Sequence, residues 1–215
     1  MLRYLPLKRF HTRFAAVALV AFAWLSAGIA QAGIASLEDA MKPMVVGKAD
    51  APVTIFEFAS LGCPHCAHFH ETTYPELKKN YIDTGKVRLV FTDFPLGGPA
   101  LAASMIARCA GPSRYFGFVE LFFRAQEQWS RADPPIDALK KVARFGGLTP
   151  ADVDACIKQQ PLIDFIQGTA RKASKDHEIN STPSFLVNGT KVSGALPYAE
   201  FKVFVDEALK KAQTK

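Results

Sequence analysis

The sequence predicts an α/β domain in which a long helical segment interrupts one sheet along the chain. Residues 53–59 and 87–94 are mostly apolar and partly β-branched, which is typical of buried strands, and a helical stretch separates them. Strand, helix and strand at this spacing form a right-handed crossover, so these two strands are expected to be parallel. A further strand and the hairpin signal Asn188-Gly189 follow near the end of the chain.

The first 32 residues are typical of an export signal. They begin with basic residues and no acid, namely Arg3, Lys8, Arg9 and Arg13. An apolar stretch from Phe14 to about Leu25 follows, and Ala30-Gln31-Ala32 has the small-x-small pattern that a signal peptidase cleaves. The apolar stretch is shorter than the roughly 20 residues that cross a bilayer, so we expect cleavage after residue 32 and a periplasmic location. An uncleaved N-terminal anchor is the alternative.

Loss of this segment changes the size and charge of the chain. The remaining 183 residues suffice for one domain with a hydrophobic core, and the formal net charge falls from +6 to +2. The lysine pairs that remain, at 78–79, 140–141 and 210–211, are scattered and are typical of solvated helix surfaces. The sequence has no basic stripe of the kind that binds nucleic acid.

The elements of the first half follow from periodicity and turn signals. The first strand leads through a turn at residues 60–62 into a helix from Cys63 to about Tyr81, with a bend expected near Pro75. After the second strand, a helix is expected to start near Pro99. The next helix carries apolar residues at helical spacing, namely Phe116, Val119, Phe122 and Phe123.

The second half has clear start and stop signals. Asp133-Pro134 resembles an N-cap followed by a first-turn proline, and Gly146-Gly147 ends that helix. Thr149 to Asp152 opens another helix, and the last helix of the block runs from about Pro161 to His177. A hairpin and an amphipathic helix close the chain; their expected positions are residues 184–187 and 191–193, then Phe201, Phe204, Val205 and Leu209.

These elements divide the chain beyond the export signal into two parts. Residues 33–96 and 178–215 are expected to form the sheet domain, and residues 97–177 the helical insertion.

The chemistry is expected at the start of the first helix. An exported chain with four cysteines implies oxidising chemistry; the cysteines can pair in three ways, and their spacing suggests one local and one long-range bridge. Cys63 lies where free backbone N–H groups and the positive end of the helix dipole favour thiolate, the form that attacks disulfides. Pro64 fits the first turn because it needs no N–H partner, and His65 can donate to the sulfur or pair with its charge. Cys66 is placed to resolve a mixed disulfide.

Glu57 is the second chemical signal. An acid in the middle of an apolar strand is expensive to bury, so we interpret it as a proton acceptor beneath the disulfide with a raised pKa. The alternative is a carboxylate on a solvated strand end.

A metal site is the alternative for the same stretch. Cysteines and histidines alternate there as Cys-x-His-Cys-x-His-x-His, with His65, His68 and His70 among them. On one helix these side chains fan around the axis, and only Cys66 and His70 share a face at i, i+4. We therefore expect no metal site and place His68 and His70 on the surface or along a groove. Haem attachment is excluded because alanine follows Cys66.

The motif Cys63-Pro64-His65-Cys66, six residues after Glu57, resembles the thioredoxin superfamily, and its Pro-His dipeptide resembles DsbA. Thr182-Pro183 resembles the cis-proline segment that faces the reactive disulfide in that superfamily and bonds the substrate chain. The helical insertion resembles the DsbA elaboration of the thioredoxin fold. Cys109 and Cys156 resemble an extra structural disulfide in the helical region of some bacterial DsbA proteins.

The resemblance implies a function. It implies a dithiol oxidase that donates the Cys63–Cys66 disulfide to unfolded or reduced exported proteins through a mixed disulfide, and we expect the chain to be a monomer. It further implies reoxidation by a DsbB-like membrane quinone reductase, with no cofactor beyond the disulfide itself. Thr182 favours the alternative of a disulfide isomerase or reductase, because the best-known DsbA has valine there. The remaining alternative, from another class, is a periplasmic metal-binding or metal-tolerance protein.

Overall fold

The computed structural model describes residue 1 and residues 33–214. The predicted export signal, apart from Met1, lies outside the described residues. In the described part of the chain, no helix is both long and apolar enough to cross a bilayer.

A five-stranded sheet forms the centre of the fold, in the order β1-β3-β2-β4-β5. Its strands are β1 (Met44–Val46), β2 (Val53–Ala59), β3 (Val87–Asp93), β4 (Ser184–Val187) and β5 (Thr190–Ser193). The predicted parallel pairing of β2 with β3 is confirmed, and the other neighbours are antiparallel. Glu57 in the central strand β2 is in register with Phe91 on one side and Phe185 on the other.

Two elements near the N-terminus were not predicted. They are the short helix α2 (Leu37–Ala40) and the edge strand β1, which pairs with β3. A strand of three residues is too short to show an alternating pattern, so only its partner strand identifies it.

Three helical segments and the C-terminal helix frame the sheet face that carries Glu57. They are α3 (Pro64–Thr72), α4 (Tyr74–Leu77), the π-helical η1 (Lys78–Ile82) and α11 (Tyr198–Gln213). The bend predicted near Pro75 occurs at Thr73, because a proline in the first turn of α4 has no N–H to continue the ladder of α3. Phe69 of α3 packs against Phe185 and Phe201, with ring centroids 4.6 and 5.3 Å apart, and so fixes α3 on β4 and α11.

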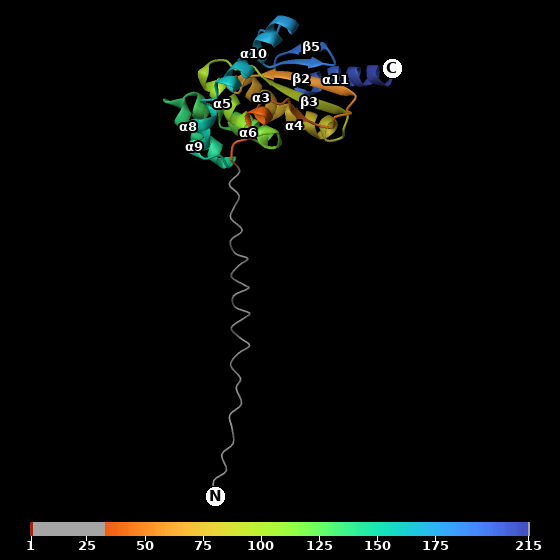
Figure 1. Cartoon of the computed structure of the whole chain (residues 1–215). Coiled ribbons are helices and arrows are strands. Elements are labelled where there is room, and N and C mark those ends of the chain that lie inside the picture. Colours follow the sequence, from red (N-terminus) through yellow and green to blue (C-terminus); the bar gives the residue numbers. More distant parts are fainter. Residues whose placement is uncertain (2–32, 215) are drawn as a thin grey trace. The chain divides into compact units, whose positions relative to one another are not determined.

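The helical insertion contains six helices, several of which gather beside one end of the sheet (Figure 1). They are α5 (Gly98–Cys109), α6 (Pro112–Arg124), α7 (Gln126–Ser130), α8 (Pro135–Phe145), α9 (Pro150–Cys156) and α10 (Gln160–His177). The predicted start of α9 is confirmed by a capping box between Thr149 and Asp152. The predicted start of α8 is wrong by one residue: Pro134 is the N-cap and Pro135 occupies the first turn. Either proline fits a first turn, so the sequence does not choose between them.

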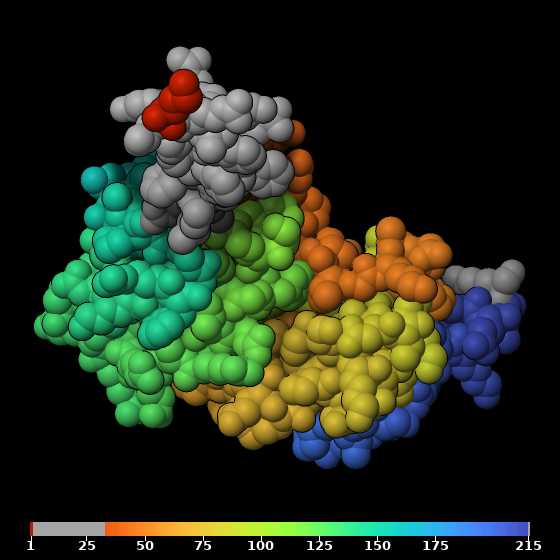
Figure 2. All heavy atoms as spheres, turned by 90° about the horizontal axis from the view of Figure 1, so that it is seen from below, coloured from red at the N-terminus to blue at the C-terminus, as the bar shows by residue number. Residues whose placement is uncertain are grey.

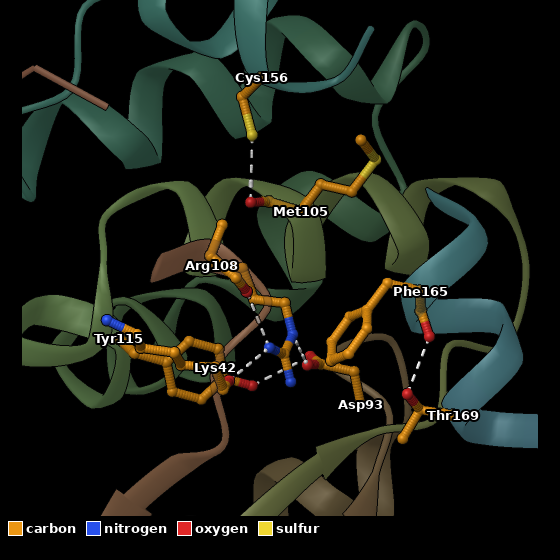
Figure 3. Close-up of polar contacts among 9 residues, drawn as sticks. Lys42, Asp93, Met105, Arg108, Tyr115, Cys156, Phe165 and Thr169 are labelled. Atoms are coloured by element: carbon orange, nitrogen blue, oxygen red, sulfur yellow. Dashed lines mark hydrogen bonds and ion pairs between the residues drawn. The ribbon is translucent and has the colours of Figure 1, made fainter. Parts of the chain in front are cut away.

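A buried ion pair ties the insertion to the sheet (Figure 3). Arg108 of α5 donates through Nε to Asp93 Oδ2 at the end of β3, at 2.5 Å, and Tyr115 of α6 donates to the other carboxylate oxygen at 3.0 Å. Nη1 of Arg108 also donates to the carbonyl oxygens of Ala40 and Lys42, at 2.9 and 3.1 Å. One guanidinium therefore joins α5, β3 and the segment that precedes β1.

Cys109 and Cys156 form a disulfide between α5 and α9, with Cα atoms 6.2 Å apart. Both residues are fully buried in a small apolar cluster of the insertion. The bond closes a loop of 47 residues, which in the chain-entropy model stabilises the fold by about 4 kcal/mol.

Replacing both cysteines by alanine is expected to lower the free energy of unfolding by roughly 2–5 kcal/mol while thiol–disulfide exchange at the other pair continues. Urea unfolding and an exchange assay on the same sample would measure the two effects. Loss of exchange in a variant shown to be folded would instead make Cys109 and Cys156 redox partners of the main site.

Candidate active site

The loop between β2 and α3 is held from two sides. Ser60 Oγ accepts hydrogen bonds from the backbone N–H groups of Gly62 and Leu96, at 3.2 and 3.1 Å. Gln126 of α7 is buried, and its Nε2 donates to the carbonyl oxygens of Leu61 and Cys63 at 2.6 and 3.1 Å. The helical insertion therefore positions the reactive loop directly. This role of Gln126 was not predicted.

Cys63 is the N-cap of α3, and Pro64 follows in the first turn. Its thiol is free and only 5% of the residue is exposed. The pKa of Cys63 is lowered from 9.0 to about 5, chiefly by the hydrogen bond from the Cys66 thiol. Burial opposes this shift, and Thr182 and the backbone N–H groups of Cys66 and His65 support it. Cys63 is therefore a thiolate at neutral pH.

Cys66 has the opposite character. It is fully buried, and burial raises the pKa of its thiol far above the ordinary value, with further increases from its hydrogen bond to Cys63, the Cys63 charge and the Glu57 charge. In the reduced pair the proton therefore stays on Cys66. This division makes Cys63 the attacking sulfur and Cys66 the resolving one.

Thr182 and Pro183 lie opposite Cys63. The peptide bond between them is cis, and the carbonyl oxygen of Thr182 is 3.3 Å from the Cys63 sulfur. Two segments that are 119 residues apart in sequence thus meet at the reactive sulfur.

The His65 side chain has no hydrogen bond to the Cys63 sulfur in the described part of the chain. It is exposed, and only the His65 backbone N–H contributes to the low pKa of Cys63. The predicted action of the imidazole on the sulfur stays a prediction.

Glu57 is completely buried, so the alternative of a solvated strand-end carboxylate is wrong. Its Oε1 is 2.8 Å from Nε2 of His70, and the His70 side chain is only 7% exposed. His70 was expected on the surface or along a groove, and it does line a groove, but its bond to the buried acid was not predicted. The one available signal was its i, i+4 spacing from Cys66, because a residue one turn after a buried cysteine shares the buried face.

A groove of about 960 Å³ lies next to this pair. One wall belongs to α3 and α4 and the other to α6 and the start of α7; Figure 2 shows the gold atoms of the first wall beside the green atoms of α6. Pro64, His70 and Phe123 are among its lining residues, so the groove runs from the reactive loop to the buried histidine. A second hollow, of about 560 Å³, lies between the β4–β5 turn and the end of α11 and does not reach the cysteines.

The ligand set of the metal alternative does not converge. His65 and His68 are exposed, whereas His70 bonds to Glu57. Within residues 33–214 no three histidine, cysteine, aspartate or glutamate side chains are grouped as metal ligands.

Comparison with known proteins gives a consistent set of similarities. The thioredoxin family model matches residues 39–207. A Rickettsia bellii protein named "Putative protein-disulfide oxidoreductase" is 31% identical over 80% of this chain and 66% of its own length. "Disulfide bond formation protein D" of Bacillus subtilis is 26% identical over 77% of each chain. The crystal structure of Wolbachia pipientis alpha-DsbA1 has a TM-score of 0.76 and 28% identity, over 80% of this chain and 94% of that one. The chain thus spans just under two thirds of the Rickettsia protein.

Proposed function

We propose, from the premise that this chain belongs to the thioredoxin family, that it is a thiol–disulfide oxidoreductase which acts through Cys63 and Cys66. The observation that carries the proposal is the unequal pair of thiols. The pKa of Cys63 is lowered to about 5 and that of Cys66 is raised far above the usual range. An ordinary structural cysteine pair has no need of a stable thiolate on one partner. The similarity to named disulfide oxidoreductases supports the same chemistry.

The reaction follows from these two sulfurs. In the oxidised protein a substrate thiolate attacks Cys63, a new sulfur–sulfur bond forms to the substrate, and Cys66 leaves as a thiolate that takes up a proton. A second substrate thiolate then attacks the substrate sulfur of this mixed disulfide, and Cys63 leaves as a stable thiolate. The substrate loses two electrons and the protein gains them. Thr182, whose carbonyl oxygen is 3.3 Å from the Cys63 sulfur, would bond the substrate backbone.

We favour the oxidase direction over the isomerase or reductase. A thiolate at Cys63 stabilises the reduced protein, which makes the disulfide a stronger oxidant. The substrates would be reduced exported proteins, in keeping with the predicted export signal and a periplasmic location. A membrane quinone reductase of the DsbB kind would restore the disulfide, and the chain would act as a monomer without a further cofactor.

The direction has a testable consequence for stability. The depressed pKa of Cys63 stabilises the reduced protein above pH 5, and this gain grows by at most about 1.36 kcal/mol per pH unit until the thiol of the unfolded chain also ionises, near pH 8.5. Residual solvent contact of the sulfur reduces that slope. Closing the four-residue loop of the disulfide stabilises the oxidised protein by only about 2 kcal/mol. At pH 8 the reduced protein is therefore expected to be the more stable form.

Urea midpoints of both forms between pH 5 and pH 8 measure this. These midpoints are compared in a Cys109→Ala/Cys156→Ala background, so that only the Cys63–Cys66 pair changes its redox state. The midpoint of the reduced form is expected to rise relative to that of the oxidised form as pH increases, and further replacement of Cys63 and Cys66 by serine should remove the redox dependence. An oxidised form that is clearly more stable at pH 8 would reject the oxidase and favour the reductase or isomerase.

A further inference from the structure

Only one oxygen of the buried Glu57 carboxylate has a hydrogen-bond partner in the described part of the chain. Its Oε1 is bonded to His70, while Oε2 is buried and has no hydrogen-bond partner within the described residues. An unpartnered carboxylate oxygen in an apolar interior is costly unless it accepts a proton at some stage. Glu57 therefore has a free atom at which a proton can arrive.

His70 lies next to both this acid and the groove. Its ring packs against those of Tyr74 and Phe123, with centroids 4.7 and 4.6 Å away, and makes an edge contact with Phe91 of β3. His70 also lines the groove between α3–α4 and α6, whereas Glu57 does not. Histidine accepts and releases protons readily near neutral pH. His70 thus bonds directly to Glu57 and also borders the open groove.

Cys66 is the group that has a proton to exchange. It is fully buried, and it lies one turn before His70 on the same face of α3, where side chains at i and i+4 are neighbours. That face packs on β2, the strand of Glu57, and the Glu57 charge is felt at the Cys66 sulfur. Each passage of Cys66 between thiol and disulfide must move a proton into or out of this interior.

We propose a proton relay in which His70 passes the Cys66 proton between Glu57, the proton acceptor expected from the sequence, and the groove beside α3. The proposal rests on the exchange reaction proposed above and assigns His70 a part in it. When the disulfide forms, the Cys66 proton passes to Glu57, and His70 takes it over the Oε1–Nε2 bond and releases one to the groove. The Cys66 thiolate then attacks the Cys63 sulfur of the mixed disulfide, and the departing thiolate takes the electron pair of the broken bond. Opening of the disulfide runs the same route in reverse.

Other charges near the relay must be considered in any pH profile. Tyr74 of α4 contacts the His70 ring, and burial raises the pKa of its hydroxyl well above the usual value, so it stays protonated at neutral pH. From β3 and α6, the aromatic side chains that pack against the His70 ring are Phe91 and Phe123. The remaining titratable or charged groups line the groove, namely His68, Glu71, Lys78, Glu120, Arg124 and Glu127.

The test follows the two steps of oxidation separately, with glutathione disulfide as the probe. Reduced protein first forms a mixed disulfide at Cys63 and then closes the Cys63–Cys66 bond, and acid quenching with mass analysis resolves both rates. In His70→Gln the amide can still donate to Glu57 but cannot carry a proton. Ring closure in His70→Gln is expected to slow by about tenfold or more and to lose its dependence on pH near neutrality, while the first step is unchanged. His68→Gln, on the same helix and groove but exposed, should match the parent in both steps.

The outcomes separate the two proposals. A parent protein that forms no mixed disulfide at Cys63 contradicts the exchange reaction itself. A parent that reacts normally, with a folded His70→Gln variant that closes the ring at the same rate and with the same pH profile, overturns the relay alone. If His70→Gln does not fold, the solvent deuterium isotope effect on the parent decides. A larger effect on ring closure than on the first step supports the relay, and equal effects overturn it.

Discussion

Cys63→Ser is expected to abolish thiol–disulfide exchange, at least roughly 10³-fold, whereas Cys66→Ser is expected to capture substrates in a lasting mixed disulfide. The reason is the division of roles between the two sulfurs. With a pKa of about 5, Cys63 is a thiolate at neutral pH, and a serine hydroxyl at that position has no comparable nucleophilicity. In Cys66→Ser the new hydroxyl can still donate to Cys63, so the thiolate persists while the resolving sulfur is lost.

Each variant is first converted to its mixed disulfide with glutathione by glutathione disulfide. It is then incubated with a reduced, unfolded protein, whose thiolate attacks the cysteine sulfur of the variant and releases glutathione, and non-reducing gels measure both effects. The matched control is Cys109→Ala/Cys156→Ala, which should neither lose exchange nor trap substrate because those cysteines are buried in their own bond. Mixed disulfides through Cys66 in Cys63→Ser, with none through Cys63 in Cys66→Ser, would reverse the assignment of the two roles.

The inner strands of the sheet could be predicted because each has a recognisable local sequence pattern. The apolar, β-branched run of β2 has the predicted bounds, and the turn Asn188-Gly189 marks the β4–β5 hairpin. The edge strand β1 could not be predicted, since its three residues carry no period of their own. Its pairing with β3 depends on the tertiary structure and not on a local sequence pattern.

The candidate site was predictable only in part. The position of Cys63 at a helix start follows from sequence, whereas its meeting with Thr182 across 119 positions came from family resemblance alone. Gln126 and Arg108 were missed because a polar residue in an amphipathic helix is usually on the solvated face. Periodicity tells which residues share a face, as Cys66 and His70 do, but packing decides which polar group on that face is buried.

The Asp93–Arg108 pair is where the largest loss of stability is expected. Both side chains are almost fully buried, at 1% and 4% exposure. Burial by itself lowers the pKa of Arg108, but the Asp93 charge, the Tyr115 hydroxyl and the hydrogen bond to Asp93 together outweigh it. The net shift is upward, so the guanidinium stays charged. Removing one partner leaves a buried charge without compensation, which costs more than the pair itself contributes.

Asp93→Asn is therefore expected to lower the free energy of unfolding by about 3–5 kcal/mol, although the new side chain has nearly the same shape. The double variant Asp93→Asn/Arg108→Met should lose less than the sum of the two single variants, because each single change already breaks the shared contact. The exposed pair Lys78–Asp83 is the control, and Asp83→Asn should change stability by less than about 1 kcal/mol. Urea unfolding of the four variants measures all of these values. A loss in Asp93→Asn no larger than that in Asp83→Asn would show that the buried pair does not hold the insertion to the sheet.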